Sequence, residues 1–368
     1  MPQKYQNPII TSRVTAGFLH CYISIHKASP GRYHAQFISH DRHTMLAALF
    51  KMMTDGQFHS GESLGKALGV SRAAVWKSLK RLEEDGYPIQ RVRGKGYRVP
   101  FGAALLDLEE IAKAVPGKLG AEVQWQLLGA VDSTNAQLMK RLSMDRPRPM
   151  ICMAEQQTAG RGRRGREWVS PYGQNIYLSL ALPFSGGAQR LEGLSLLVGL
   201  VLVETLEASG FKGCALKWPN DVLLDGRKLA GILIEIAGDL TSDCVAIIGV
   251  GVNVLMNDAD AAIDQAWTSL LLSRQSGVLN RNILIAEFVE RLLQAVLVFR
   301  TEGFAPFAVA WEKRDAWYGL PVSVRSGAAS IDGVELGVDA RGALRLRTAD
   351  GEVLLNGGEV SLRLQHDS

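Results

Sequence analysis

The chain has 368 residues, of which 47% are hydrophobic and 21% are charged, so it is long enough for two or three domains and can bury a sizeable core. Its 41 lysines and arginines against 37 acids give a net charge of +4, which excludes a histone-like polycation and confines any nucleic-acid contact to one patch or module. The four cysteines are scattered without a CxxC pair, which indicates reduced thiols rather than a disulfide framework or a zinc site.

Neither the apolar runs nor the N-terminus suggests a membrane protein. The longest run, at residues 191–203, contains Glu192 and is closed by Glu204, so it is shorter than the ~20 residues that span a bilayer. The N-terminus lacks a charged region followed by an apolar core and a cleavage site. We therefore predict a cytoplasmic protein that has no membrane partner.

Residues 1–44 have mixed polarity and no sustained periodicity. We predict that this segment is disordered, or that it does not belong to the natural product. Because strong patterning begins at Met45, we hypothesise that Met45 is the true start.

Residues 45–100 have the pattern of three helices and a hairpin. The first helix begins at Met45, the second follows Ser60, a good N-cap, and ends at Gly69, and the third follows Ser71. In the third helix Val75, Leu79 and Leu82 are spaced i, i+4, i+7 and form a core stripe. Residues 87–99 read as two short strands about a Gly-Lys-Gly turn, and the whole predicts a winged helix-turn-helix.

Basic residues lie both on the outer face of the third helix and in the wing, which favours contact with DNA. The alternative is that this three-helix unit is only a docking module, whose charged face is exposed to solvent and does not contact DNA. The predicted DNA-binding residues are Ser71, Arg72, Lys77, Lys80 and Lys95.

The rest of the chain divides into a linker and two domains. Residues 101–120 read as a linker with a short helix, and residues 121–317 alternate strands with helices, which predicts an α/β domain on a mixed sheet. Residues 318–368 contain five short alternating runs separated by Gly and Asp turns, which predicts a small β-barrel packed on the α/β domain.

The loop GRGRRGREW at residues 160–168 alternates glycine with arginine. Glycines let a backbone approach a ligand closely, and guanidinium groups suit carboxylate or phosphate. By itself this loop is equally consistent with a basic surface loop that touches RNA.

Several separated motifs occur in a fixed order: DSTN at 132–135, the loop at 160–168, KWPND at 217–221, RKLAGILIE at 227–235, GVGVNV at 249–254 and GGEVSL at 357–362. This set resembles the bacterial biotin-protein ligases. The winged helix in front resembles the bifunctional subclass, in which the ligase is also the biotin operon repressor. The resemblance covers residues 45–364 and implies a multidomain α+β protein with a catalytic domain like that of class II synthetases and an SH3-like C-terminal barrel.

The resemblance also implies roles for individual residues. Lys228 and Arg163 are the predicted catalytic residues. The predicted biotin-binding residues are Ser133, Thr134, Asn135, Gln157, Arg161, Gly162, Arg163 and Lys228. The predicted nucleotide-binding residues are Arg166, Trp168, Lys217 and Asn220. Two of these residues have an alternative interpretation. Trp168 suits a position in the hydrophobic core nearly as well. Lys217 either joins the cluster of charged side chains at the site or pairs with Asp221.

The residue types suit an acyl-adenylating enzyme. The chain has no GxxxxGK[ST] motif, so phosphates are not held in a P-loop. Attack of a carboxylate on the α-phosphate of ATP brings two anions together, and fixed cations lower that barrier. Biotin and ATP are the expected substrates, and Mg²⁺ is expected with ATP, held mostly by phosphates and water, so that no protein ligand is predicted for it.

The predicted reaction forms biotinyl-5′-AMP and transfers biotin to a lysine of the biotin carboxyl carrier protein of acetyl-CoA carboxylase. The resemblance also implies operator DNA as a partner and a homodimer in the adenylate-bound state. Two alternatives are a lipoate-type acyl-protein ligase and a ligand-sensing transcriptional regulator without ligase activity.

Overall fold

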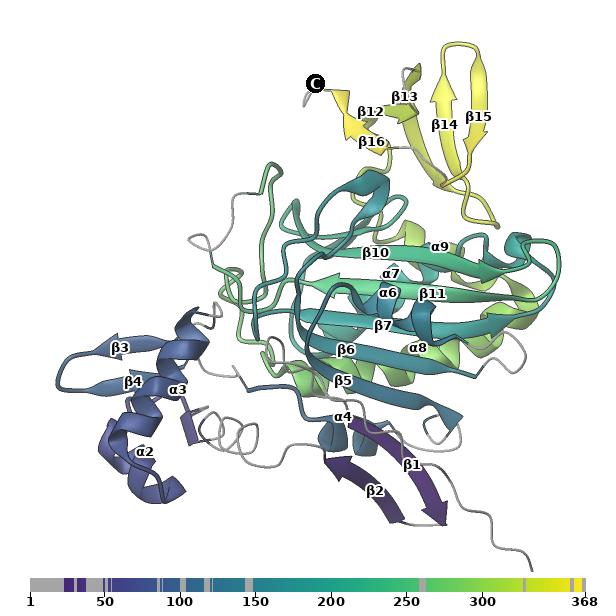
Figure 1. Cartoon of the computed structure of the whole chain (residues 1–368). Helices are drawn as coiled ribbons and strands as arrows, with labels where there is room; N and C mark the ends of the chain where they lie inside the picture. The colour runs from purple at the N-terminus through teal and green to yellow at the C-terminus, as the bar shows by residue number, and fades with distance from the viewer. Residues whose placement is uncertain are drawn as a thin grey trace, which may run out of the picture.

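The fold is that of a computed structural model, and it describes residues 23–29, 32–37, 49, 52–53, 55–84, 87, 89–99, 104–115, 120, 122–142, 148–257, 263–326, 329–357 and 361–365. Along this part of the chain a winged-helix domain, a central α/β domain and a C-terminal β-sheet follow one another (Figure 1). This order of domains confirms the predicted fold class. Closure of the C-terminal sheet into a barrel is not confirmed.

The winged-helix domain contains α2 (Gly61–Leu68), α3 (Arg72–Glu84), β3 (Gln90–Val92) and β4 (Gly96–Arg98). Ser60 caps α2 by accepting a hydrogen bond from the Ser63 N–H at 3.0 Å, and Gly69 ends that helix at φ 66°. The predicted first helix lies mostly outside the described residues. The stripe predicted for α3 is buried, and β3 pairs with β4 as the predicted wing.

A nine-stranded sheet forms the centre of the molecule, and all its neighbouring strands are antiparallel except β5 and β6. The strands, in spatial order, are β2 (Arg32–Phe37), β1 (Ile23–Ser29), β5 (Gln124–Val131), β6 (Met150–Gln157), β7 (Ile176–Phe184), β11 (Cys244–Val252), β10 (Arg227–Gly238), β9 (Asp221–Leu224) and β8 (Cys214–Lys217). The helices around it are α4 (Leu108–Ala114), α6 (Thr134–Arg141), α7 (Leu194–Ala208), α8 (Arg281–Glu302) and α9 (Ala308–Glu312), with short 3-10 turns η1 (Arg163–Gly165), η2 (Ala188–Leu191) and η3 (Ala305–Phe307).

The two faces of this sheet bury different sets of side chains. Alternate residues of a strand point to opposite faces, so in β6 Ile151 and Met153 join the large core that contains α7 and α8. Cys152 and Ala154 instead join a smaller core with Leu138 of α6. Motif residues gather on the face covered by α6, where Asn135 and Trp168 lie against glycines of β10 and β11.

Long helix α7 begins later than its apolar run. The sequence predicts a helix over residues 191–209, whereas α7 spans Leu194–Ala208 and follows η2. Gly193 separates the two with φ 78°, and a side chain there would meet Phe304 and the carbonyl of Arg341.

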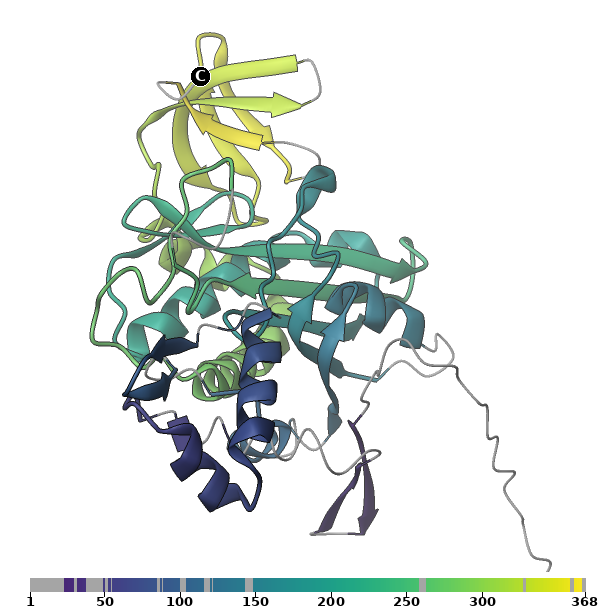
Figure 2. The same ribbon diagram turned by 60° about the vertical axis from the view of Figure 1, so that its left-hand side comes forward.

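The winged-helix domain is attached to the central domain by a buried tyrosine and a clamped linker. Figure 2 shows its helices beside the central domain. Tyr87 packs against Gly173, where any side chain would overlap its ring. Arg281, at the start of α8, is fully buried and donates to Glu155 Oε2 at 2.8 Å and to the linker carbonyl of Ala104 at 2.8 Å. Glu155 Oε1 in turn accepts the N–H of Leu106 at 2.6 Å, so one ion pair joins linker, sheet and helix.

The C-terminal strands form one antiparallel sheet in the order β15-β14-β13-β12-β16. They are β12 (Pro321–Ser326), β13 (Ala329–Val338), β14 (Leu344–Thr348), β15 (Gly351–Leu355) and β16 (Ser361–Leu364). The number of strands agrees with the five predicted runs. Closure of this sheet into an SH3-like barrel stays a prediction.

Strands β1 and β2 were not predicted. The structure pairs them antiparallel and joins β1 to β5 through Ile23 and Leu127. Edge pairing uses backbone groups, so it does not require the apolar alternation whose absence led us to expect disorder. The start at Met45 stays a hypothesis.

Replacing Arg281 with Met removes the cation beside buried Glu155 and frees the linker. We expect the free energy of unfolding to fall by about 3–5 kcal/mol, because a carboxylate is left buried without its partner. Urea unfolding followed by circular dichroism measures this. The control Arg291→Met lies exposed on the same helix and is expected to change stability by less than about 0.5 kcal/mol; equal losses in both variants would contradict the clamp.

Candidate active site

The arginine-glycine loop folds as a small hairpin above the α6 face of the sheet. Arg161 and Glu167 form an isolated antiparallel bridge, and the tip contains Arg164 and Gly165 at φ 58° and 70°. A side chain at position 160 would collide with the carbonyl of Trp168. The loop thus needs glycine at 160 and 165, whereas Gly162, at φ −103°, has no such local requirement.

The arginines of this hairpin, which we call the lid hairpin (residues 160–168), reach different partners. Arg161 forms an ion pair with Glu235 at 3.0 Å. Arg163 donates to Asn220 Oδ1 and to the Gly357 carbonyl, both at 2.9 Å, so it joins the β8–β9 turn to the C-terminal domain. Arg164 donates to Ser361 Oγ at 3.1 Å. Arg166 is exposed.

Glycines of β10 and β11 make room for two of the predicted site residues. A Cβ at Gly249 would lie 2.5 Å from Asn135 Oδ1, and a Cβ at Gly251 would lie 2.5 Å from the Trp168 indole. Gly231 on β10 lies beneath the same indole. The GVGVNV motif is thus explained by packing, because its glycines face the site and its valines face the core.

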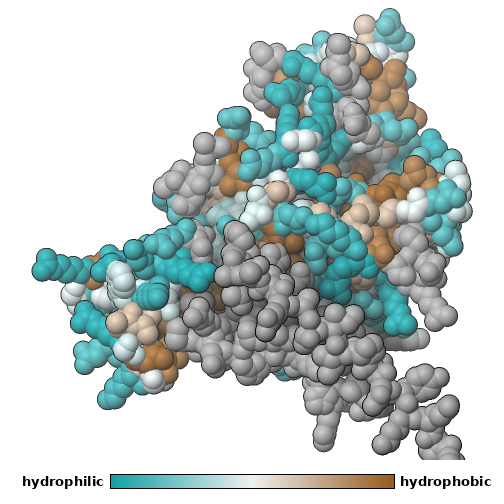
Figure 3. Space-filling view, viewed as in Figure 1, coloured by the Kyte–Doolittle hydropathy of each residue, from teal (hydrophilic) through white to brown (hydrophobic). Residues whose placement is uncertain are grey.

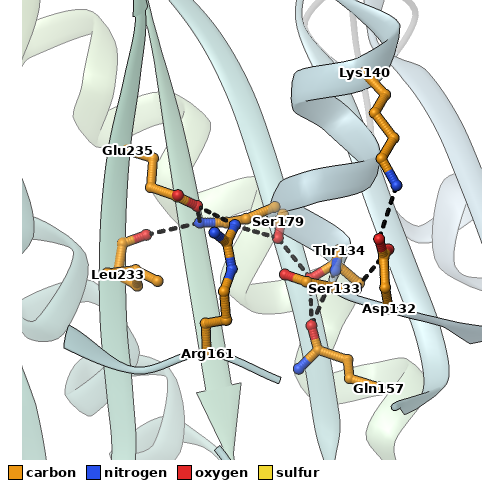
Figure 4. Close-up of polar contacts among 10 residues, drawn as sticks. Asp132, Ser133, Thr134, Lys140, Gln157, Arg161, Ser179, Leu233 and Glu235 are labelled. Carbon is orange, nitrogen blue, oxygen red and sulfur yellow. Dashed lines mark hydrogen bonds and ion pairs between the residues drawn. The ribbon is translucent and has the colours of Figure 1, made fainter. Parts of the chain in front are cut away.

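A chain of polar contacts connects the DSTN segment with three strands (Figure 4). Gln157 Oε1 accepts from the Thr134 N–H at 2.9 Å and lies 3.2 Å from the Thr134 hydroxyl oxygen. Ser179 Oγ lies 2.6 Å from both Thr134 Oγ1 and Asn135 Oδ1. Ser133 occupies the N-cap of α6 without a capping bond from its hydroxyl.

Lys228 lies at an irregularity in the pairing of β9 with β10, between Lys228 and Ala230. A β-bulge re-aims side chains, and here the ammonium group lies 2.7 Å from Asp221 Oδ1 and 5.7 Å from the centre of the Trp168 ring. Both partners of this ion pair are largely buried. The site thus holds one fixed cation beside an indole, within the glycine-lined face.

Lys217 lies near this pair but does not take Asp221 as its ion-pair partner, since Lys228 does. Its ammonium group lies over the Trp317 ring at 4.3 Å, and burial lowers its pKa. The charge of Asp221 raises the pKa of Lys217, and the charges of Lys228 and Arg166 lower it, so both alternatives left open by the sequence remain.

A buried carboxyl pair lies on the other side of Lys217. Asp315 follows α9, and Glu335 of β13 is fully buried. Burial raises the pKa of both groups, and the Asp315 carboxylate raises the pKa of Glu335 further. This pair was not predicted from the sequence, because its members belong to two domains and neither lies in a motif.

Three residues of the site were missed by the sequence analysis. Ser179 is a single hydroxyl in the apolar run IYLSLAL, Glu235 ends the motif RKLAGILIE, and Asp221 ends KWPND. The signal was present in each case, since a polar side chain in an apolar strand needs a partner. The identity of the partner follows only from the pairing of strands.

The predicted DNA-binding residues Ser71, Arg72, Lys77, Lys80 and Lys95 are all exposed. Four of them belong to α3 or its N-terminal cap, where Ser71 Oγ accepts the Ala74 N–H at 3.1 Å, and Lys95 lies in the wing turn. The ammonium group of Lys80 pairs with Glu84 at 3.5 Å. The outer part of this domain is mainly hydrophilic in Figure 3, where it extends to the left.

The described residues contain neither a membrane-spanning helix nor a cluster of metal-binding side chains. No helix in this part of the chain is long and apolar enough to cross a membrane. Across the same residues, no group of three or more His, Cys, Asp or Glu side chains is placed to hold a metal ion.

Comparison with known proteins identifies the family. The bifunctional ligase/repressor BirA of Escherichia coli (strain K12) is 39% identical over 323 residues, which cover 87% of this chain and 98% of that protein. The chain belongs to the family of bifunctional biotin ligase/repressors. A shorter relative, the biotin--[acetyl-CoA-carboxylase] ligase of Paracoccus denitrificans, is 38% identical over 64% of this chain and 98% of its own length.

Family models and a solved structure support the same assignment for each domain. An HTH domain matches residues 45–98, the biotin/lipoate A/B protein ligase family matches residues 128–253, and the biotin protein ligase C-terminal domain matches residues 319–363. The biotin protein ligase from Aquifex aeolicus in complex with biotin and ATP has a TM-score of 0.56 and 28% identity, covering 66% of this chain and 99% of that one.

Replacing Glu335 with Gln tests the buried carboxyl pair through the pH dependence of stability. A carboxyl group whose pKa in the folded protein is raised above its ordinary value of 4.5 stabilises the fold while it is protonated. This stabilisation is complete below pH 4.5 and is lost as the pH rises through the pKa of the folded state. We therefore expect wild-type stability to fall from pH 5 toward pH 8 more steeply than that of Glu335→Gln. Thermal midpoints over this range measure it, and parallel curves would contradict the assignment.

Proposed function

We propose that this chain is an ATP-dependent biotin-protein ligase that also represses transcription by binding DNA. The observation that carries the enzymatic part is the placement of Lys228, beside Trp168 and Asp221, on the same glycine-lined face as the Thr134–Asn135–Gln157 network. An acyl group held at the network has its carboxylate directed toward a fixed cation. Membership of the biotin ligase/repressor family supplies the identity of that acyl group.

The first step joins biotin to AMP. A carboxylate oxygen of biotin attacks the α-phosphorus of ATP, the bond to the bridging oxygen breaks, and pyrophosphate leaves. Lys228 offsets the negative charge that the two reactants share, and Arg163 holds the lid hairpin against Asn220 and the C-terminal domain. Ser133, Thr134, Asn135 and Gln157 bind the biotin ring, and Arg161 and Gly162 cover it.

The nucleotide occupies the side of the site lined by Trp168, Arg166, Lys217 and Asn220. Trp168 packs on Gly231 and Gly251, which hold its ring in the site for adenine to stack or pack against. Mg²⁺ enters as the complex of ATP and is held mostly by phosphates and water.

The second step transfers biotin to a protein. The ε-amine of a lysine in the biotin carboxyl carrier protein of acetyl-CoA carboxylase attacks the acyl carbon, the acyl–phosphate bond breaks, and AMP leaves. We further propose a cytoplasmic protein that forms a homodimer when the adenylate is bound, so that two α3 helices meet a two-fold operator.

The reaction is tested by incubating the protein with labelled biotin, ATP and a carrier domain. We expect covalent label on the carrier, and Lys228→Ala is expected to lower the rate of adenylate formation by at least about 10²-fold, because one fixed cation at the reacting charge is lost. Pyrophosphate release measures this step. No label from wild type would favour a regulator without ligase activity, and a preference for lipoate would favour a lipoate-type ligase.

The DNA-binding part is tested with fragments of the promoter region upstream of the chain's own gene, with and without biotin and ATP. We expect Arg72→Ala to weaken binding and to lower the slope of log K against log salt by about 0.9, because one phosphate contact is lost. Gel shifts at several salt concentrations measure both. The control Lys313→Ala is exposed on the central domain and is expected to leave the slope unchanged; a fall in ligation by Arg72→Ala would show that the two activities are not separate.

A further inference from the structure

Glu235 lies where the lid hairpin meets the Thr134–Asn135–Gln157 network. Its Oε2 accepts from Asn135 Nδ2 at 2.8 Å and forms the ion pair with Arg161 at 3.0 Å. Figure 4 shows the carboxylate of β10 and the guanidinium of the lid pointing toward one another, with Ser179 and Thr134 beyond them. One acid thus contacts both the floor and the cover of the site.

The carboxylate also decides how the Asn135 amide is oriented. An ionised carboxylate only accepts hydrogen bonds, and the carbonyl of Leu233, 3.3 Å away, also only accepts. The amide nitrogen must therefore face β10, which leaves Oδ1 as an acceptor on the other side. Without these two acceptors, the amide could rotate and exchange its donor and acceptor.

The orientation of the Asn135 amide determines which groups donate and which accept in the rest of the network. Because Asn135 Oδ1 can only accept, the hydroxyl proton of Ser179 is donated to it across 2.6 Å. The single hydroxyl proton of Ser179 is then used, so its contact with Thr134 Oγ1, also at 2.6 Å, requires the Thr134 hydroxyl to donate. The pattern of donors and acceptors on the network is consequently fixed from one end by Glu235.

The position of Glu235 on its strand agrees with such a role. Gly231, Leu233 and Glu235 alternate along the face of β10 that carries the site, and this face is glycine-lined next to Trp168. The Glu235 side chain is 26% exposed and that of Arg161 is 48% exposed. A surface ion pair of this kind contributes little to stability, so its position over the site argues for a role in binding.

We propose that Glu235 is a positioning residue for the ligase reaction: its carboxylate sets the donor and acceptor pattern that receives the ureido ring of biotin and ties Arg161 of the lid hairpin to that ring pocket. This inference rests on the proposed function. It adds a residue that acts through Asn135 and Arg161 and touches neither reacting centre.

The two contacts of Glu235 can be separated by two variants. Glu235→Ala removes both and leaves the Asn135 amide nitrogen with only the Leu233 carbonyl at 3.3 Å. It is expected to raise the KM for biotin about tenfold while the KM for ATP changes less than about twofold. Glu235→Gln keeps an acceptor oxygen for Asn135 and loses the charge that holds Arg161. We expect its KM for biotin to stay within about threefold of wild type, and its preformed adenylate to be released faster.

The measurements are steady-state kinetics of carrier labelling with each substrate varied, release of adenylate in a single turnover, and the thermal midpoint. The matched control Glu302→Gln lies exposed at the end of α8 and is expected to match wild type throughout. A general loss of structure would lower kcat and shift the midpoint without separating the two KM values, and that outcome would overturn the proposal.

The measurements distinguish a failure of this proposal from a failure of the proposed function. If wild type labels the carrier and Glu235→Ala keeps the wild-type KM for biotin, Glu235 has no positioning role. If Glu235→Gln retains adenylate as well as wild type does, the tie to the lid hairpin is refuted. If wild type gives no label at all, the ligase assignment itself fails.

Discussion

The site depends on two neighbouring strands that carry glycine on one face and bulky apolar residues on the other. Gly249 and Gly251 of β11 admit Asn135 and Trp168 at distances that no Cβ would allow, while the valines between them pack into the core beside α7 and α8. A slip of one residue in the pairing of β10 with β11 would place valines under the site. The register of nine paired residues between these strands therefore fixes both the core and the chemistry.

The domains on either side are attached close to this face. The clamp made by Arg281 and Glu155 holds the linker of the winged-helix domain, and Glu155 belongs to the strand that ends at Gln157, which bonds to Thr134. On the opposite side, Arg163 and Arg164 at the tip of the lid hairpin bond to the C-terminal domain. The lid hairpin thus contacts the C-terminal domain directly, whereas the linker of the DNA-binding domain contacts β6 through Glu155.

The charged side chains inside the molecule form ion pairs, lie over aromatic rings or favour the neutral form. Among the described ion pairs, Asp221 pairs with Lys228 and with no other ammonium group. The ammonium group of Lys217 lies over the Trp317 ring. Deeper, Glu335 shares a buried site with Asp315, and burial together with the Asp315 carboxylate raises the pKa of Glu335, which favours its protonated form. The exposed pair of Arg161 and Glu235 differs from these, since solvent screens it and lets it open.

The sequence by itself determined the order of domains, the N-terminal cap and core stripe of α3 and the set of motifs that identified the family, because these depend on local periodicity and turn chemistry. It did not determine β1 and β2, whose pairing uses backbone groups, or whether the C-terminal sheet closes. Only the tertiary structure decided that Asp221 pairs with Lys228, that Glu235 joins Asn135 to Arg161, and that Glu335 meets Asp315. Each of these contacts joins residues from different strands or domains, and the register and packing that bring them together are properties of the whole sheet.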